Sequence, residues 1–499
     1  MISDTVLKEA YFVRDPRQRE RLQNSHPDKT ADANWCSQRS FGMKAKVSAW
    51  GNRIYHILDQ ELSRLDYVIL GVLYVFLFLS FTFPDVIVTG NRSFIMQSYP
   101  LAFYRKAQEI AGNGANYLPS TFWLYAAWNL PLRLLHCVPD FADAYSFSLV
   151  RTVWYRLLPL LFFAVSARSV RKIALRLGMD QVKAKLCQYL FLAFPCTIFS
   201  QFIFSQYDIF TVCMMLLGYE AWLKEDNRGF VFWFGLAITF KYQALVYFVL
   251  LLVYRHKQIF RIIWNVILVA IPAALEILIY YHDEAFISQV FGFNAISYTG
   301  GSFQLGGLTS VTPFLVCVIA LMIFAYVKPY EANQAARYSV FLMNGVNFAF
   351  YGLAVFNPQW LLIAVPFQVF GIMMNKKAKF LLLLEDLFIV AFYILTVNYY
   401  LSVDQWTLGF MVWHDAIMST GHGWPVTMSD IYLFTDTTFL FTIVFSILGS
   451  FFWLSHPRYQ QEDCSVVEPD TRLNVRLGLW ISVLAWAVPA YLCLMAMLR

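Results

Sequence analysis

Long apolar segments separated by short polar ones run along most of this 499-residue chain. About 20 consecutive apolar residues allow a helix to cross the hydrocarbon core of a bilayer. The pattern therefore predicts an all-α polytopic membrane protein with about 11 full transmembrane helices. The predicted spans are residues 66–84, 147–167, 184–204, 208–223, 258–281, 308–327, 338–356, 359–374, 379–401, 431–454 and 476–498.

The N-terminal residues 1–65 do not follow this pattern. Residues 1–46 are polar and mixed in charge, which favours a partly disordered cytoplasmic tail without a cleavable signal peptide. From Val47 to Leu65 apolar residues recur at helical spacing. This spacing predicts an amphipathic helix on the inner membrane surface, or else a short extension of the first span.

Clusters of Lys and Arg predict how the chain is oriented. The positive-inside rule places these clusters in the cytoplasm, together with the N-terminus. They occupy residues 168–185, 224–228, 255–261, 328–337, 375–379 and 456–475.

With this orientation, two further apolar segments cannot be single helices that cross the membrane. Residues 119–135 carry Pro at both ends ("LPSTFWLYAAWNLP"), so we expect a short juxtamembrane or re-entrant helix inside one external loop, 85–146. Residues 229–253 would form a hairpin of two half-spans with "FKYQ" at its external tip. A second external loop is expected at 402–430, among C-terminal helices that occupy 376–499.

The composition supports a membrane protein and excludes some partners. Hydrophobic residues make up 59% of the chain and charged residues 14%, against about 25% charged in soluble domains. A net charge of +6 gives no reason to expect a nucleic-acid partner. The eight Cys residues lack metal-ligand spacing, and the His and Asp residues of 402–430 are irregularly spaced, so we expect neither a metal nor a disulfide framework.

Two carboxylates stand at predicted membrane boundaries. Asp85 follows the first span in "FTFPDVIVTG", and Asp208 lies at the external end of the third span in "FSQYDIF". Either could be an ordinary solvated acid, but ionisable residues flanked by apolar sequence are functional candidates. Burial also raises the pKa of a carboxyl group and makes its anion a stronger base.

Cations occur on the same predicted face. Lys241 interrupts the hydrophobic hairpin, Arg105 lies in the long external loop, and Arg151 stands in the outer part of a span. Arginine and lysine bind phosphate, so these residues could hold an anionic headgroup. For Arg151, snorkelling toward lipid headgroups is an equally good explanation.

Four features together resemble the GT-C superfamily of multi-spanning glycosyltransferases. Asp85 follows the first span in a large external loop, and "NYLPSTFWLYAAW" resembles the family's Tyr-Pro-Pro-Leu segment, although Leu118 and Ser120 replace expected residues. "SQYD" resembles a Gly-Gln-x-Asp element, and "FKYQALVYFVLLLVYRHK" a Lys-Pro-Gln-Ala hairpin. "FNPQWLLIAVP" resembles a His-Pro-Gln-Tyr motif in which Asn357 replaces the His. The resemblance covers residues 66–375.

The resemblance implies an enzyme that moves a monosaccharide from a polyprenyl-phosphate donor to an acceptor on the non-cytoplasmic face, with inversion and without a cofactor. The acceptor would be a glycan, a lipid-linked saccharide or a protein. Asp85 would be the general base, or Asp208 in its place. Lys241, with Arg105 or Arg151, would hold the donor phosphate. The implied substrate-binding residues are Tyr117, Gln206, Gln243, Gln359 and Trp360.

Other functions remain open from the sequence. A lipid-linked oligosaccharide flippase or another transporter would also carry charges in the membrane, and Glu276 lies in a predicted span. An O-antigen polymerase or ligase would also act on polyprenyl-linked sugars, but its large loop is expected late in the chain. We expect an integral membrane protein, in a bacterial cytoplasmic membrane rather than the endoplasmic reticulum.

Overall fold

Helices dominate the part of the chain that the computed structural model describes. The described residues are 61–112, 115–143, 145–292, 303–305, 309–354, 356–396, 437–465, 467 and 471–498. The chain divides into two units, Met1–Leu58 and Asp59–Arg499, and all described residues belong to the second. The predicted tail and the predicted loop 402–430 lie outside the described residues.

Helices α2 (Arg64–Ser80) and α3 (Pro84–Ser98) occupy the first predicted span and the residues after it. The chain bends by 65° between them. The bend falls at Pro84, because proline fits the first turn of a helix but cannot continue one. Helix α2 therefore corresponds to the predicted first span, and α3, which carries several polar residues, to the start of the predicted external loop.

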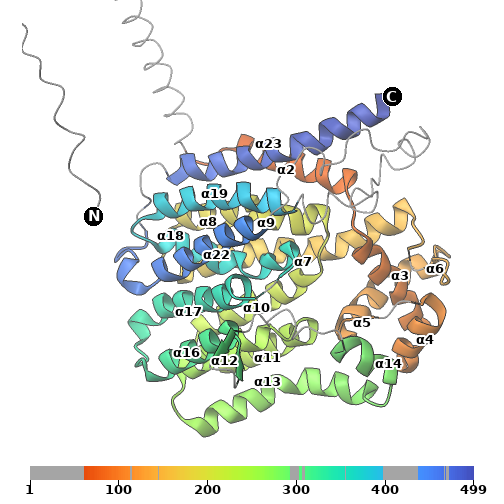
Figure 1. The fold of residues 1–499 in the computed structure, drawn as a ribbon, viewed down its shortest axis with the longest axis horizontal. Coiled ribbons are helices and arrows are strands. Elements are labelled where there is room, and N and C mark those ends of the chain that lie inside the picture. Colours follow the sequence, from red (N-terminus) through yellow and green to blue (C-terminus); the bar gives the residue numbers. More distant parts are fainter. Residues whose placement is uncertain are drawn as a thin grey trace, which may run out of the picture. The chain divides into compact units, whose positions relative to one another are not determined.

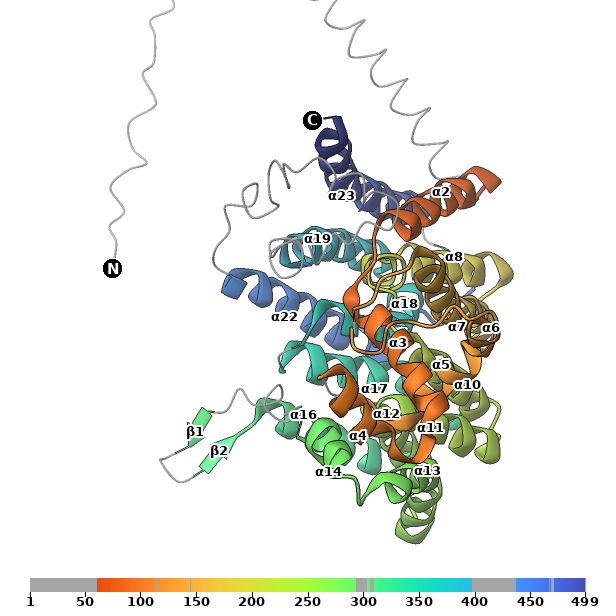
Figure 2. The same cartoon turned by 90° about the vertical axis from the view of Figure 1, so that its right-hand side faces the viewer.

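The predicted external loop, residues 85–146, folds into short helices that pack on one another. They are α3, η2 (Pro100–Ala102), α4 (Phe103–Ala111), α5 (Pro119–Trp128) and α6 (Leu130–Leu134). Helix α5 has 10 residues, about 15 Å of length, which is too short to cross a bilayer. The prediction of a short helix that begins at a proline is confirmed. Figures 1 and 2 show α3, α4, α5 and α6 together at one end of the bundle.

The next helices form the centre of the bundle. They are α7 (Leu149–Arg176), α8 (Gln181–Ala193), α9 (Pro195–Ile198), the π-helical segment η3 (Phe199–Ile203) and α10 (Asp208–Leu223). The chain bends by 53° after α8, where Pro195 begins α9. Helix α10 packs between α7 and the following helix, so its first residue lies well inside the bundle.

Two short helices lie where the sequence predicts a hairpin of two half-spans. Helices α11 (Asn227–Phe240) and α12 (Ala244–Arg255) have 14 and 12 residues and are joined by residues 241–243. Helix α13 (Ile259–Tyr280) follows, with α14 (Glu284–Phe286) and the π-helical η4 (Ile287–Phe291). The strands β1 (Phe303–Leu305) and β2 (Thr309–Val311) then pair antiparallel, a hairpin that the all-α prediction missed.

The remaining helices complete the bundle: α16 (Pro313–Val327), α17 (Ala332–Gly352), η5 (Pro358–Ile363), α18 (Val365–Met374), α19 (Ala378–Thr396), α22 (Thr437–Leu454), η7 (Pro457–Tyr459) and α23 (Thr471–Leu498). Among the described residues, α7 and α13 are each long and apolar enough to cross a membrane, and the two bent pairs raise this number to four. The predicted number of full spans is therefore not confirmed. Several other apolar helices are shorter than predicted.

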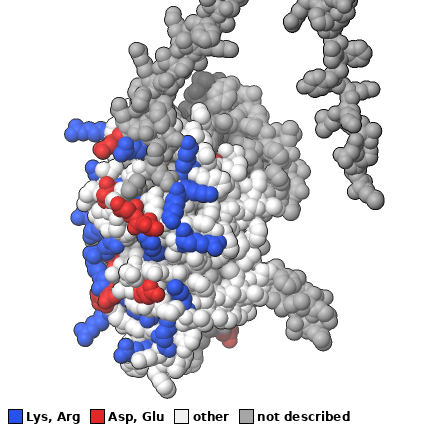
Figure 3. Space-filling view, turned by 90° about the vertical axis from the view of Figure 1, so that its left-hand side faces the viewer, with Lys and Arg blue, Asp and Glu red and all other residues white. Residues whose placement is uncertain are grey.

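The outer helices expose apolar side chains in stripes. On α13, Phe260, Trp264, Ile271 and Leu278 point outward with 43% to 84% of their surface exposed. Their spacing of four or seven residues puts them on one helix face, and such a continuous apolar surface suits contact with lipid. At the end of the unit opposite α3–α6, Lys and Arg gather on the surface (Figure 3).

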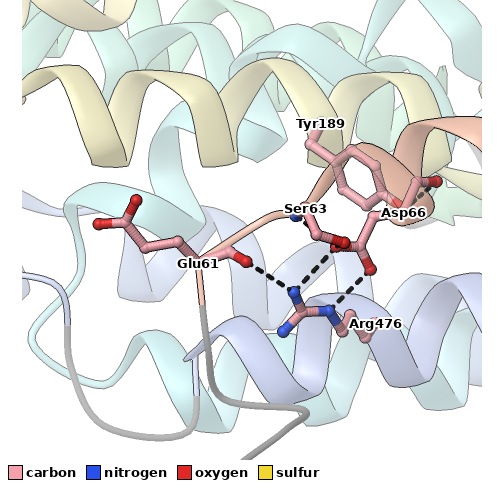
Figure 4. A network of polar contacts seen from close by, with 5 residues as sticks. All are labelled: Glu61, Ser63, Asp66, Tyr189 and Arg476. Carbon is pink, nitrogen blue, oxygen red and sulfur yellow. Dashed lines mark hydrogen bonds and ion pairs between the residues drawn. The ribbon is translucent and has the colours of Figure 1, made fainter.

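A buried ion pair joins the start of α2 to α23 (Figure 4). Arg476 Nε donates to Asp66 Oδ1 at 2.8 Å, and Arg476 Nη2 donates to Asp66 Oδ2 at 2.9 Å and to the carbonyl of Glu61 at 3.1 Å. The Ser63 backbone N–H and hydroxyl donate to the same carboxylate. Asp66 therefore caps α2 and holds the C-terminal helix against it.

Replacing Arg476 by Met should leave the Asp66 carboxylate buried without its cation. Loss of one partner of a buried pair costs about 3–5 kcal/mol. We therefore expect R476M to unfold at a clearly lower temperature than the wild type in a detergent-solubilised thermal melt. The control is R64M, at an exposed Arg in the same turn of α2 as Asp66. Equal melting temperatures for R476M and R64M would contradict the role of this pair.

Candidate active site

An ion pair between Asp208 and Lys241 forms the centre of the candidate site. Lys241 Nζ lies 2.5 Å from Asp208 Oδ2, and the two side chains are 15% and 2% exposed. The Lys241 ammonium also lies 4.8 Å from the centre of the Trp360 ring, within the range of a cation–π contact. The structure therefore brings together three residues that were selected from the sequence: Asp208 of α10, Lys241 at the hairpin tip and Trp360 of η5.

The backbone before α10 places Asp208 at this point. The π-helical segment η3 ends at Ile203, and Ser205 adopts a left-handed conformation with φ of 57°. The Gln206 N–H then donates to the carbonyl of Ser200 at 2.7 Å, which closes the turn. Asp208 becomes the first residue of α10, where the helix dipole stabilises a negative charge.

Arg156 of α7 holds this turn and the end of α2 together. Its guanidinium is fully buried and donates to Ser205 Oγ and to the carbonyls of Phe78, Phe81 and Phe202. It also lies 4.2 Å from the centre of the Phe78 ring. The carbonyls of Phe78 and Phe81 belong to the segment that leads to Asp85. One side chain thus fixes the backbone before both candidate carboxylates.

Asp85 lies beyond the end of α2, in the first turn of α3, and is half-buried. Burial and, to a smaller extent, the negative charge of Asp208 raise the pKa of Asp85 to about 6, against the opposing effect of the Arg92 guanidinium. Arg92 follows Asp85 by seven residues, two helical turns, so both lie on one face of α3. The site therefore contains one carboxylate paired with a lysine and one whose pKa is raised to about 6.

Aromatic and amide side chains surround these charges. The rings of Tyr117 and Tyr207 meet edge to face, with centroids 4.7 Å apart. The charges of Asp208 and Asp85 both act on the Tyr117 hydroxyl, which places this ring near the two carboxylates. Tyr117, selected from the sequence, thus belongs to the same cluster, and Tyr207 joins it.

The three selected glutamines lie in the neighbouring core. Gln243 Nε2 donates to the Tyr351 hydroxyl at 2.9 Å. The backbone carbonyl of Gln359 accepts from Ser200 Oγ at 3.1 Å. The Gln206 side chain is 1% exposed, and neither its oxygen nor its nitrogen has a hydrogen-bond partner among the described residues. A buried amide without a partner is costly, so Gln206 is the glutamine best suited to receive a polar ligand.

The structure places two of the selected cations in other contacts. Arg105 lies on α4 with its side chain 65% exposed, 3.9 Å from Glu109. Arg151 Nη2 donates to the Ser146 carbonyl at 3.0 Å and to its hydroxyl at 3.1 Å, which holds the end of the predicted external loop. Neither contact joins these arginines to the Asp208–Lys241 pair. We therefore leave both out of the candidate site and include Arg92.

Arg92 is one of the cations on the predicted external face but was not selected from the sequence as a site residue, although its spacing from Asp85 was a usable signal. It also gave no role to Ser120. The Ser120 hydroxyl donates to the Glu276 carboxylate, and the Ser120 N–H approaches it at 3.4 Å. Glu276 therefore caps α5 from α13. Among the described residues, no group of three or more His, Cys, Asp or Glu side chains could hold a metal ion.

Comparisons with known proteins give only distant likenesses. No protein-family model and no curated protein matches the sequence. ArnT from Cupriavidus metallidurans bound to undecaprenyl phosphate is 14% identical with a TM-score of 0.38, over 84% of this chain and 77% of that chain. The arabinosyltransferase EmbB from Mycobacterium smegmatis is 15% identical with a TM-score of 0.32, over 87% of this chain and 40% of that chain. Likenesses of this strength do not establish a shared activity.

The Asp208–Lys241 pair can be tested by a double-mutant cycle. K241M should leave a buried carboxylate without its cation and lower the free energy of unfolding by about 3–5 kcal/mol. D208N/K241M should be less destabilised than the sum of the single variants, because neither charge is then left alone. Chemical denaturation in detergent gives these values. Additive effects of the two substitutions would contradict the coupling. The control is K106M, which removes the cation of an exposed ion pair and should change the free energy of unfolding little.

Proposed function

We propose that this chain is a membrane glycosyltransferase that moves a monosaccharide from a polyprenyl-phosphate donor to an acceptor hydroxyl on the non-cytoplasmic side. The observation that carries the proposal is the contrast between its two carboxylates. Asp208 is paired with Lys241, whereas Asp85 is half-buried with a pKa raised to about 6. A carboxylate that titrates near the working pH is suited to general-base catalysis.

Asp85 would accept the proton of the acceptor hydroxyl as its oxygen attacks the anomeric carbon. The bond from that carbon to the phosphate oxygen of the donor breaks, and the polyprenyl phosphate leaves with the electron pair. One in-line displacement of this kind inverts the anomeric centre. Lys241 would stabilise the charge that develops on the leaving phosphate, since a fixed cation in a site shielded from water acts most strongly there.

The surrounding residues would bind the sugar and the lipid. Trp360 and Tyr117 offer aromatic faces, and Gln206 offers an amide whose donors and acceptor are unused among the described residues. The exposed apolar stripes on the outer helices would let the polyprenyl chain approach from the bilayer.

The transporter alternative gains no support from Glu276. Its carboxylate is bonded to Ser120 and caps α5, so it serves a structural contact. The polymerase or ligase alternative depends on residues 402–430, which lie outside the described part of the chain.

Asp85→Asn keeps the shape of the side chain but cannot accept a proton. We expect transfer of radiolabelled sugar from a panel of polyprenyl-phosphate monosaccharides to fall by about 10²–10⁴-fold in D85N membranes. Asp140→Asn, at an exposed acid of the same external loop, is the matched control and should retain activity. If folded D85N transfers sugar at the rate of the wild type, Asp85 is not the base. If the wild type transfers sugar from none of the donors, the transporter alternative is favoured.

The pH dependence of transfer tests the same residue. Asp85 acts as a base only when ionised, so activity should rise with pH through about 6 and fall about tenfold per unit below it. Because Asp208 raises this pKa and Arg92 lowers it, residual activity in D208N should have its acidic limb at lower pH. In R92Q the acidic limb of the activity profile should lie at higher pH, because the cation that lowers the pKa of Asp85 is lost. An acidic limb that moves in neither variant would contradict this assignment.

A further inference from the structure

A basic cleft lies at the end of α7 away from the candidate active site. It has a volume of about 590 Å³ and runs between α7 and α8. Its lining residues are Arg168, Arg171, Lys172, Leu175, Gln181 and Gln188. Arg168 lies 12 residues beyond Arg156 on the same helix, about 18 Å farther along its axis. The cleft is therefore separate from the proposed catalytic site.

The three cations of the cleft share one helix face. Arg168, Arg171 and Lys172 are spaced i, i+3 and i+4, so their side chains are neighbours. Like charges at this spacing destabilise a helix. Within the described part of the chain, none of the three has a carboxylate within 4.0 Å; Arg171 donates only to Gln181, at 3.0 Å. An anion in the cleft would relieve this repulsion.

An apolar stripe on α7 leads directly to these cations. Leu157, Leu161 and Val165 are 37%, 52% and 45% exposed. They recur every four residues, and Arg168 and Lys172 continue the same face toward the helix end. A ligand with an apolar tail and an anionic head would match this face along its length. A free anion would match only the cleft.

We propose that the cleft binds the headgroup of an anionic phospholipid from the cytoplasmic leaflet, with an acyl chain along the α7 stripe. The external loop precedes α7, so the far end of this helix faces the cytoplasm, as the positive-inside rule also predicts. Basic pockets between helices on that side suit phosphate headgroups. Arg168 and Lys172 supply exposed charge, while Gln181 orients the Arg171 guanidinium.

The test compares lipid retention by the full-length protein. Purified protein is exchanged into detergent with equal amounts of phosphatidylglycerol and phosphatidylcholine, and bound lipid is counted by native mass spectrometry. The wild type should retain phosphatidylglycerol preferentially. The variant R168Q/R171Q/K172Q should bind it on the order of 100-fold more weakly, because each cation lost near the surface lowers the binding constant about fivefold.

The matched control removes three exposed cations that do not line the cleft, in K185Q/R228Q/R261Q. It should retain phosphatidylglycerol as the wild type does. Equal loss in both triple variants would reduce the effect to general surface charge and overturn the proposal. Absence of a preference over phosphatidylcholine would overturn it too. Displacement of the bound lipid by millimolar inorganic phosphate would reassign the cleft to a free anion.

Discussion

The buried guanidinium of Arg156 is the contact on which the site geometry depends. Burying a charge without a carboxylate partner is unfavourable unless hydrogen bonds satisfy its donors. Arg156 meets this condition with backbone carbonyls from two separate segments, the end of α2 and the turn after η3. These segments lead to Asp85 and Asp208. Two carboxylates far apart in the sequence are thereby held in a fixed relation that neither helix could establish alone.

This relation gives the two carboxylates different properties. Asp208 starts α10 and is paired with Lys241, so its charge is stabilised inside the bundle. That retained charge then acts on Asp85 and helps to raise its pKa. A pair of carboxylates whose environments differ in this way is a common basis for separate catalytic roles. The difference arises from neighbouring residues, since both are aspartates at the starts of helices.

Sequence patterns predicted the features that local chemistry controls. The proline at the start of α5 and the interruption at Lys241 gave a short loop helix and a hairpin, and both are present. Sequence patterns failed where long-range contacts determine which partner a side chain binds. Arg151 binds the loop at Ser146 and Arg105 lies beside Glu109, and neither partner could be read from hydropathy. The bend before α3 and the shortening of several apolar helices likewise depend on packing, so the predicted spans were too regular.

Helix α7 shows why residue type alone did not identify the site. Arg151, Arg156 and Arg168 all lie on it, and each is a possible anion ligand by sequence. Arg151 is occupied by a loop carbonyl and hydroxyl, Arg156 by buried carbonyls, and Arg168 faces solvent at the cleft. An arginine whose donors already have protein acceptors has little to offer a ligand, whereas one that lacks them retains its full charge and geometry. The acceptors supplied by neighbouring backbone therefore decide which cations remain available, and this information exists only in the folded chain.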